Sequence, residues 1–139
     1  MNVRHRNLTM RVMAMILLCS TAALTQLSPS TQKVASVRIT EGPAIERVDP
    51  NSAIIRWRSN NPGGSPQHYA VVYYGTNPGE LSQTAKSSIR LNPTHSYAVF
   101  RVWMPNLQPR TTYYYKVDSM ETNGNSDGVQ SPVKEFTTR

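Results

Sequence analysis

The chain has 139 residues, 38% hydrophobic and 17% charged, with 15 Lys and Arg against 8 Asp and Glu, a formal charge of +7 and a single cysteine, Cys19. This length suits one domain with a hydrophobic core rather than two, and one cysteine excludes an intramolecular disulfide and a four-ligand cysteine zinc cluster. Ten Pro, seven Gly and seven Tyr against two Phe are typical of a turn-rich β protein and argue against a helical bundle.

The N-terminus has the pattern of a secretory signal peptide. Residues 1–11 carry three arginines and no acid, and Val12–Leu24 is an almost unbroken apolar run that ends in small residues. The run has about 13 residues, whereas a stable membrane-spanning helix needs about 20. We therefore expect residues 1–24 to be a signal peptide, with cleavage after Ala22 or Ala23 and with Met10 as an alternative start. No stable membrane span is expected after cleavage.

Cys19 offers a different interpretation of the leader, as the lipid-modified cysteine of a bacterial lipoprotein. Leu18 stands directly before it, where such sites carry a small residue, so an inert leader cysteine is favoured. Loss of the leader removes three arginines and the only thiol. The remaining chain has 12 basic and 8 acidic residues, a net charge of +4, which is ordinary for a soluble surface.

Beyond the leader, residues 25–39 are polar and lack periodicity, which predicts a linker, and residues 40–139 form the predicted domain. Short segments of alternating or β-branched and aromatic residues follow one another, separated by Pro, Gly and Asn turns. These segments are 44–49, 53–58, 68–75, 81–91, 96–104, 112–119 and 133–138. Seven strands without a helical run predict an all-β fold, a seven-stranded antiparallel immunoglobulin-like β-sandwich.

The period of two along a strand assigns side chains to faces, provided that no bulge intervenes. The residues predicted to face inward are Ala53, Ile55, Trp57, Phe100, Val102, Met104, Tyr113, Tyr115 and Val117. Those predicted to face outward are Ile54, Arg56, Arg58, Val99, Arg101, Trp103, Tyr114, Lys116 and Asp118.

The segment 106–117, NLQPRTTYYYKV, carries the most specific structural pattern. Leu107 ends one strand, a Pro-containing connection follows, and Tyr113 begins the next strand. In immunoglobulin-like sandwiches a tyrosine at this place bonds back to upstream backbone, an arrangement called the tyrosine corner. Trp57, on an early strand, supplies the large aromatic side chain of the core.

With these residues, the sequence resembles a fibronectin type III domain over about residues 40–139. It is most similar to the subtype that forms the N-terminal, non-catalytic domain of purple acid phosphatases. The matching pieces are residues 52–57, 72–75 (VYYG), 95–107 with the following Leu-x-Pro-x-Thr-x-Tyr pattern, and 131–138 (SPVKEFTT).

In that family, a following domain performs the two-metal hydrolysis of phosphate esters. The motifs Gly-Asp-x-Gly and Gly-Asn-His-Glu of that domain are absent from this sequence. The resemblance therefore implies a fold and a supporting role, and no catalytic residue, metal ligand or cofactor. The two histidines after the leader, His68 and His95, have no acidic pattern beside them and are interpreted as surface or strand-end residues.

Residues 123–128, NGNSDG, resemble the start of an EF-hand calcium loop. The twelfth position holds Lys134 in place of the bidentate Glu, with Glu135 one residue late. Turn chemistry explains the same residues, so we expect a loop without calcium.

Two surfaces are candidates for recognition. If residues 53–58 and 96–104 are neighbouring strands, Arg56, Arg58, Arg101 and Trp103 form an outward basic and aromatic ladder, in which guanidinium groups stacked on indole would hold an anionic or sugar ligand. Packing that simply covers the sheet explains the same residues. The second candidate, on the other sheet, consists of Val72, Tyr74, Tyr114 and Lys116.

The sequence thus predicts a non-catalytic module, secreted to the periplasm or the extracellular space, whose partner is an unidentified protein or a surface glycan. Nucleic acid is disfavoured because the arginines are dispersed and no recognised module matches. Two alternatives stay open: an accessory domain for a metallophosphatase on a separate chain, and a carbohydrate-binding or adhesion module.

Overall fold

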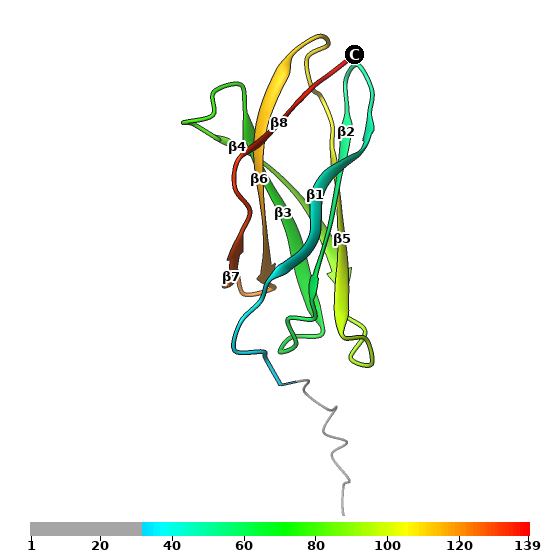
Figure 1. Ribbon diagram of the computed structural model, residues 1–139, viewed down its shortest axis with the longest axis vertical. Coiled ribbons are helices and arrows are strands. Elements are labelled where there is room, and N and C mark those ends of the chain that lie inside the picture. Colours follow the sequence, from blue (N-terminus) through cyan, green and yellow to red (C-terminus); the bar gives the residue numbers. More distant parts are fainter. Residues whose placement is uncertain (1–31) are drawn as a thin grey trace, which may run out of the picture.

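The computed structural model describes residues 32–139, which form two antiparallel β-sheets packed face to face (Figure 1). One sheet has the strand order β1–β2–β5, and the other has the order β4–β3–β6–β7, with β8 also paired to β6. The strands are β1 Ile39–Val48, β2 Ala53–Asn60, β3 Gln67–Gly75, β4 Gln83–Arg90, β5 Tyr97–Met104, β6 Thr112–Glu121, β7 Ser126–Gln130 and β8 Lys134–Thr137. The predicted antiparallel β-sandwich is confirmed. The predicted signal peptide, residues 1–24, and Cys19 lie outside the described residues.

The structure has eight strands where the sequence predicted seven, because the chain pairs with β6 in two separate pieces, β7 and β8. Residues 131–133 lie between them, and Pro132 among these has no N–H to continue the ladder. The loop predicted at residues 123–128 is shorter than expected, because the strand β7 already begins at Ser126.

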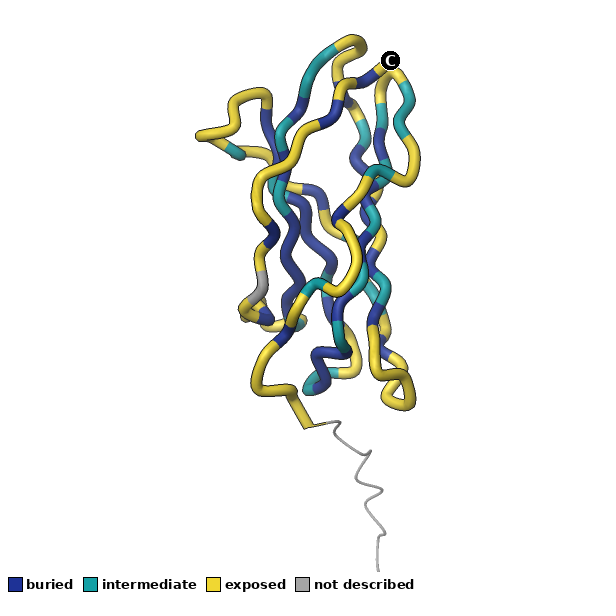
Figure 2. Tube along the Cα trace, in the orientation of Figure 1, coloured by how far each residue is buried: buried dark blue, intermediate teal, exposed yellow. Residues whose placement is uncertain are grey.

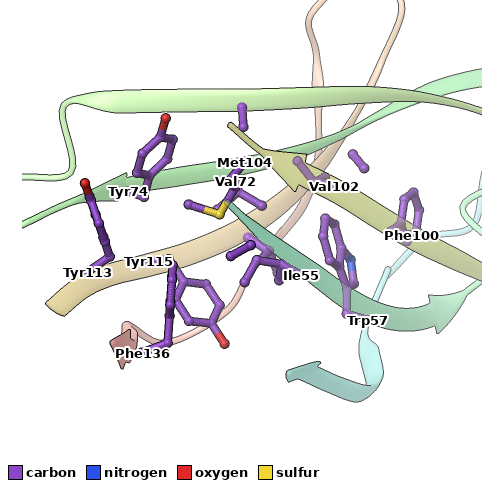
Figure 3. Packing of buried hydrophobic residues seen from close by; sticks show 14 of the residues in the cluster. Ile55, Trp57, Val72, Tyr74, Phe100, Val102, Met104, Tyr113, Tyr115 and Phe136 are labelled. Carbon is purple, nitrogen blue, oxygen red and sulfur yellow. The ribbon is translucent and has the colours of Figure 1, made fainter. Parts of the chain in front are cut away.

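The core lies between the sheets and is rich in aromatic side chains (Figure 3). Trp57 and Phe100 are register partners on β2 and β5 and stack with ring centroids 5.2 Å apart. Tyr113 of β6 stacks on Phe136 of β8, so that the core extends along the five-stranded sheet as far as β8. Figure 2 shows how burial follows the middle of the strands, while the loops are mostly exposed. All nine residues predicted to face inward are buried.

The outward face assignment holds for eight of the nine residues and fails in part for Asp118. Asp118 belongs to the outer face of β6, yet it is only 2% exposed. The hydroxyl of Ser126 donates to its carboxylate, and the N–H of Ser119 donates to the same group. Burial raises the pKa of Asp118. The strand β7, which the sequence did not predict, supplies the serine that buries this carboxylate.

The tyrosine corner is present as predicted. The hydroxyl oxygen of Tyr113 accepts a hydrogen bond from the backbone N–H of Gln108 at 2.9 Å. Leu107 is buried beside it, and its N–H donates to the carbonyl of Asn51 at 2.9 Å. These two bonds fix the connection between β5 and β6, where the chain crosses from one sheet to the other.

Replacing Tyr113 by Phe should lower the free energy of unfolding by about 1–3 kcal/mol, because the N–H of Gln108 loses its partner while the ring remains in the core. Urea unfolding followed by circular dichroism measures this loss. The matched control is Tyr114→Phe on the outer face of the same strand, with an expected change within about 0.5 kcal/mol. Equal changes at the two tyrosines would contradict the corner.

The predicted linker, residues 25–39, is described only from Gln32 onward, and its end is attached to the sandwich. Val37 is buried, and the N–H of Val34 donates to the carbonyl of Pro62 at 3.0 Å. The N–H of Arg38 donates to the side chain of Asn60, and β1 begins at Ile39. The segment 32–38 therefore covers one end of the sandwich.

Candidate functional site

The outer face of the three-stranded sheet carries the first predicted surface. Strands β2 and β5 are neighbours, with Ile54 opposite Trp103 and Arg56 opposite Arg101. Arg58 lies two residues further along β2. The predicted ladder is thus assembled on one face, and Trp103 in it is 61% exposed.

The arginines of this ladder are paired with carboxylates of β1. Arg56 Nη1 lies 2.8 Å from Glu41 Oε1, and Arg58 Nη1 lies 3.7 Å from the other oxygen of the same glutamate. Arg101 donates to both carboxylate oxygens of Glu46, a bidentate pair. Hydrogen bonding by Arg56 and by Arg101 lowers the pKa of Glu41 and of Glu46, respectively. The face is therefore close to electrically neutral, and its guanidinium planes are held in place.

The predicted stacking of guanidinium on indole is not found within residues 32–139. The guanidinium of Arg58 lies over the ring of Tyr97, 4.1 Å from its centroid, and the other cation–π contact joins Lys116 to Tyr73. The indole of Trp103 is left without a stacked cation. Tyr97 sits on β5 opposite Asn60, near the far end of the pairing with β2.

The second predicted surface is wrong in half of its residues. Tyr74 is 8% exposed and Val72 fully buried, and both belong to the core rather than to a recognition surface. Tyr74 packs edge-on against Tyr113, and Figure 3 shows both rings among the core side chains. In the β3–β6 register, Tyr74 is opposite Tyr115, which is an inward residue.

Tyr114 and Lys116 do lie on the outer face, and their neighbour there is Tyr73, opposite Lys116. Both are half-buried. The ammonium group of Lys116 donates to the side chain of Gln130 at 3.1 Å. This surface contains one paired cation and two phenol rings, and it lacks the fixed acid–base pairs of the other face.

A buried polar cluster lies where segment 32–38 covers the sandwich, and the sequence did not predict it. The side chains of His68 and Asp127 are fully buried, with His68 Nδ1 2.9 Å from Asp127 Oδ2. His68 Nε2 lies 3.1 Å from the carbonyl oxygen of Gly63. Because both partners of the ring are acceptors, both ring nitrogens carry hydrogen, and the imidazole is protonated. The interpretation of His68 as a surface residue is corrected, whereas His95 is exposed.

The charges of this cluster are balanced by a chain of contacts. Burial disfavours the charged form of both groups. The hydrogen bond to Asp127 and its negative charge nevertheless raise the pKa of His68. The hydrogen bonds from His68 and Ser119 and the positive charge of His68 lower the pKa of Asp127. The second oxygen of Asp127 has no hydrogen-bond partner and lies 3.8 Å from Lys33 Nζ. Lys33 also approaches Glu121 at 3.5 Å.

The cluster contains Ser, His and Asp, but it is not arranged as a nucleophilic triad. The hydroxyl of Ser119 donates to Asp127 at 2.6 Å rather than to the imidazole. His68 has no free ring nitrogen that could act as a base, since Nδ1 faces Asp127 and Nε2 is hydrogen-bonded to the carbonyl oxygen of Gly63. The arrangement is a buried ion pair that fixes three segments of chain to one another.

The segment resembling a calcium loop is a hairpin turn between β6 and β7. The N–H of Asn125 donates to the side chain of Asn123, and the N–H of Gly124 donates to the carbonyl of Glu121. Asp127 points away from the loop, toward His68. In the part of the chain that the structure describes, no group of three or more His, Cys, Asp or Glu side chains is placed to hold a metal ion.

The sequence did not reveal the role of Glu41 and Glu46, because they are five residues apart and a regular strand would place them on opposite faces. Register shifts between Glu41 and Ala44 and between Ile45 and Arg47 bring both carboxylates to the outer face. The Gly-Pro pair at 42–43 was the only available sign of such a bulge.

A family model described as the N-terminal domain of purple acid phosphatase matches residues 43–138. Two solved structures, a longer and a shorter form of the sensor domain of the anti-sigma factor RsgI4 from Pseudobacteroides cellulosolvens, each match with a TM-score of 0.50. Their identities are 20% and 21%, and the matches cover 73% and 76% of this chain and 88% and 96% of theirs. The third fibronectin III domain of the human KIAA0343 protein matches with a TM-score of 0.40 and 15% identity, over 86% of this chain and 92% of that chain. No curated protein sequence matches the chain.

Among residues 32–139 there is no helix with the length and apolar character of a membrane span.

Proposed function

The chain belongs to the family of purple acid phosphatase N-terminal domains, and from this premise we propose that it is a secreted, non-catalytic module that binds a partner through the outer face of its three-stranded sheet. The observation that carries the proposal is the fixed, exposed arrangement on that face. Trp103 presents an indole to solvent, and the arginines around it are oriented by Glu41 and Glu46. Tryptophan and arginine are the residue types that dominate binding surfaces.

Export is part of this proposal and rests on the leader, residues 1–24, with its arginines and apolar run. The folded domain contains no cysteine, so the oxidising conditions outside the cytoplasm have no thiol to act on there. N-terminal sequencing of chain recovered from the periplasm or the medium checks this part, with a new terminus expected at Ala23 or Leu24.

A second candidate function is favoured by the family itself. The alternative is that this domain, which matches the N-terminal domain of purple acid phosphatase, acts as an accessory to a metallophosphatase catalytic domain on a separate chain. A metallophosphatase gene beside this one, together with co-elution of the two products, would favour the accessory role over an independent binding module.

Binding is expected to depend on the outer face of the three-stranded sheet. The combined variant Arg56→Ala, Arg101→Ala, Trp103→Ala should lose about tenfold or more in affinity, since each exposed contact contributes about 0.5–1 kcal/mol. Arrays of glycans and of purified extracellular proteins, followed by calorimetric titration of each positive, measure the effect.

The control is the double variant Lys86→Ala, Arg90→Ala on β4. It also removes two positive charges, but from an exposed edge of the other sheet. This control should bind like the unmodified domain. Unchanged binding by the Arg56, Arg101, Trp103 variant would reject the face. Turnover of a phosphate ester by the purified chain with added iron and zinc would reject the non-catalytic assignment.

A further inference from the structure

The charge balance of the three-stranded sheet's outer face decides what kind of ligand it suits. Each of the three arginines of the ladder already lies against a carboxylate: Arg56 and Arg58 share Glu41, and Arg101 holds Glu46 in a bidentate pair. A polyanion would have to displace these internal partners, and it would meet two fixed negative charges. The face is therefore poorly suited to phosphate, sulfate or uronate groups, in contrast to what the arginines alone suggest.

Trp103 provides the apolar part of this face. Its indole is exposed beside the pair formed by Arg101, two residues earlier on β5, and its neighbour on β2 is the half-buried Ile54. A stable protein interface buries about 800 Å² on each partner around an apolar centre depleted of charge. Here one aromatic ring adjoins ion pairs that a protein partner would have to desolvate, which is costly.

A neutral sugar suits this face, because it carries no charge that the carboxylates would repel and its hydroxyls can contact the ion pairs without desolvating them. A pyranose ring has a face of C–H groups, which are attracted to the electron-rich face of an indole, and a rim of hydroxyl groups. A hydroxyl both donates and accepts, so it bonds to the free N–H groups of Arg101 and Arg56 and to the remaining lone pairs of Glu46 and Glu41 without breaking either ion pair. The face thus offers a platform and a fixed polar rim on neighbouring strands.

We propose that the outer face of the three-stranded sheet binds an uncharged glycan, with one pyranose ring stacked on Trp103 and the hydroxyls of adjacent sugars bonded to the Arg101–Glu46 and Arg56–Glu41 pairs. This inference rests on the proposed binding function and names the chemical class of the ligand. The proposed site extends along the face from Trp103 to Arg56, so an oligosaccharide is bound more tightly than a single sugar.

The two tryptophans allow a direct test by intrinsic fluorescence. Trp57 is buried in the core and Trp103 is exposed, so a blue shift or a loss of acrylamide quenching on adding ligand reports on Trp103. The probes are neutral hexasaccharides of glucose, mannose and N-acetylglucosamine, with oligogalacturonate as the anionic counterpart. We expect at least one neutral probe to shift the emission, with an affinity that changes less than about twofold between about 50 and about 500 mM salt.

Variants then locate the site. Trp103→Ala should weaken glycan binding about tenfold or more. Its binding is measured by calorimetry, because the variant lacks the fluorescent tryptophan that reports on the site. Trp103→Tyr should recover much of the lost affinity. Lys86→Ala, Arg90→Ala should bind as the unmodified domain does. Glu46→Gln separates the roles of charge and geometry, since a neutral-glycan site should lose modestly while an anion site should gain.

Three outcomes would overturn the inference: no shift with any neutral probe, preferential binding of oligogalacturonate with a steep loss in salt, or unchanged glycan affinity in Trp103→Ala. The proposed binding function fails separately. If a protein or anionic ligand binds and the Arg56, Arg101, Trp103 variant loses it, the face is an interaction surface and only the glycan assignment is wrong.

Discussion

Replacing Trp57 by alanine is expected to lower the free energy of unfolding by about 3–5 kcal/mol, the range for removing a large buried aromatic side chain. Trp57 is 2% exposed, it stacks on Phe100, and it lies among the side chains of both sheets. Typical domains are stable by about 5–15 kcal/mol, so this one change removes a large part of the total. Urea unfolding followed by far-ultraviolet circular dichroism measures it without relying on tryptophan emission.

The other tryptophan is the matched control. Trp103→Ala removes the same side chain from an exposed position, and the expected change lies within about 0.5 kcal/mol. A large difference between the two variants follows from the alternation along β2 and β5. Similar losses at Trp57 and Trp103 would contradict the faces assigned to these strands.

Replacing Asp127 by alanine should cost about 3–5 kcal/mol at about pH 5, because it leaves the buried imidazolium of His68 without its counter-charge. The pair is fully buried, and the lost carboxylate also accepts a hydrogen bond from Ser119 and faces the ammonium group of Lys33. The double variant His68→Leu, Asp127→Leu should be far less damaged than the sum of the two single changes, since it removes both charges together.

The same ion pair gives the domain a pH dependence with a definite sign. The pKa of His68 is raised above 6.5, so its contribution is complete below pH 6.5 and is lost as the pH rises through the folded-state value. The pKa of Asp127 is lowered below 3.8, so its contribution is present above pH 3.8 and is lost as the pH falls further. Asp118 acts in the opposite direction. Burial raises its pKa, so this carboxyl group destabilises the fold once the pH exceeds 3.8, the ordinary pKa of an aspartate.

Maximum stability is therefore expected in mildly acidic solution, between about pH 4 and 6.5, with a decline toward alkaline pH. Thermal unfolding across pH 3 to about 9 measures the profile, and Asp127→Ala should flatten its alkaline side. The surface pair of the exposed Arg47 and the half-buried Asp49 serves as control, since surface ion pairs contribute little and Asp49→Ala should not flatten the alkaline side. A stability maximum at alkaline pH would contradict the charged state assigned to His68.

Alternation predicted the faces of β2, β5 and the first half of β6 because these strands pack one side on the core and leave the other outside. Trp57, Phe100 and Tyr115 are the inward residues of a regular period. Strand β3 is different, because Ala70, Val71 and Val72 are buried in succession. Its sequence therefore shows no alternation from which the inward and outward residues could be told apart. Tyr74 was therefore assigned to the wrong surface.

The parts that could not be predicted depend on contacts between distant segments. His68 and Asp127 are 59 residues apart, and only the packing of β3 against the β6–β7 hairpin brings them together. The carboxylates that neutralise the ladder are placed by bulges in β1, and no rule of alternation locates a bulge. Sequence reasoning thus found the arginines and Trp103 of the candidate face, but it overestimated the positive charge that a ligand meets there.

The two ends of the described chain lie at opposite ends of the sandwich, with the strands running between them (Figure 1). A pull applied to both ends acts along β1 and β8, whose pairings with β2 and β6 are antiparallel ladders across that direction. Several hydrogen bonds in each ladder are then loaded in shear at the same time, rather than opened one after another. Lys134, which donates to the carbonyl of Pro43 at 2.7 Å, joins β8 to β1 across the sheets, so these two strands resist such a pull together.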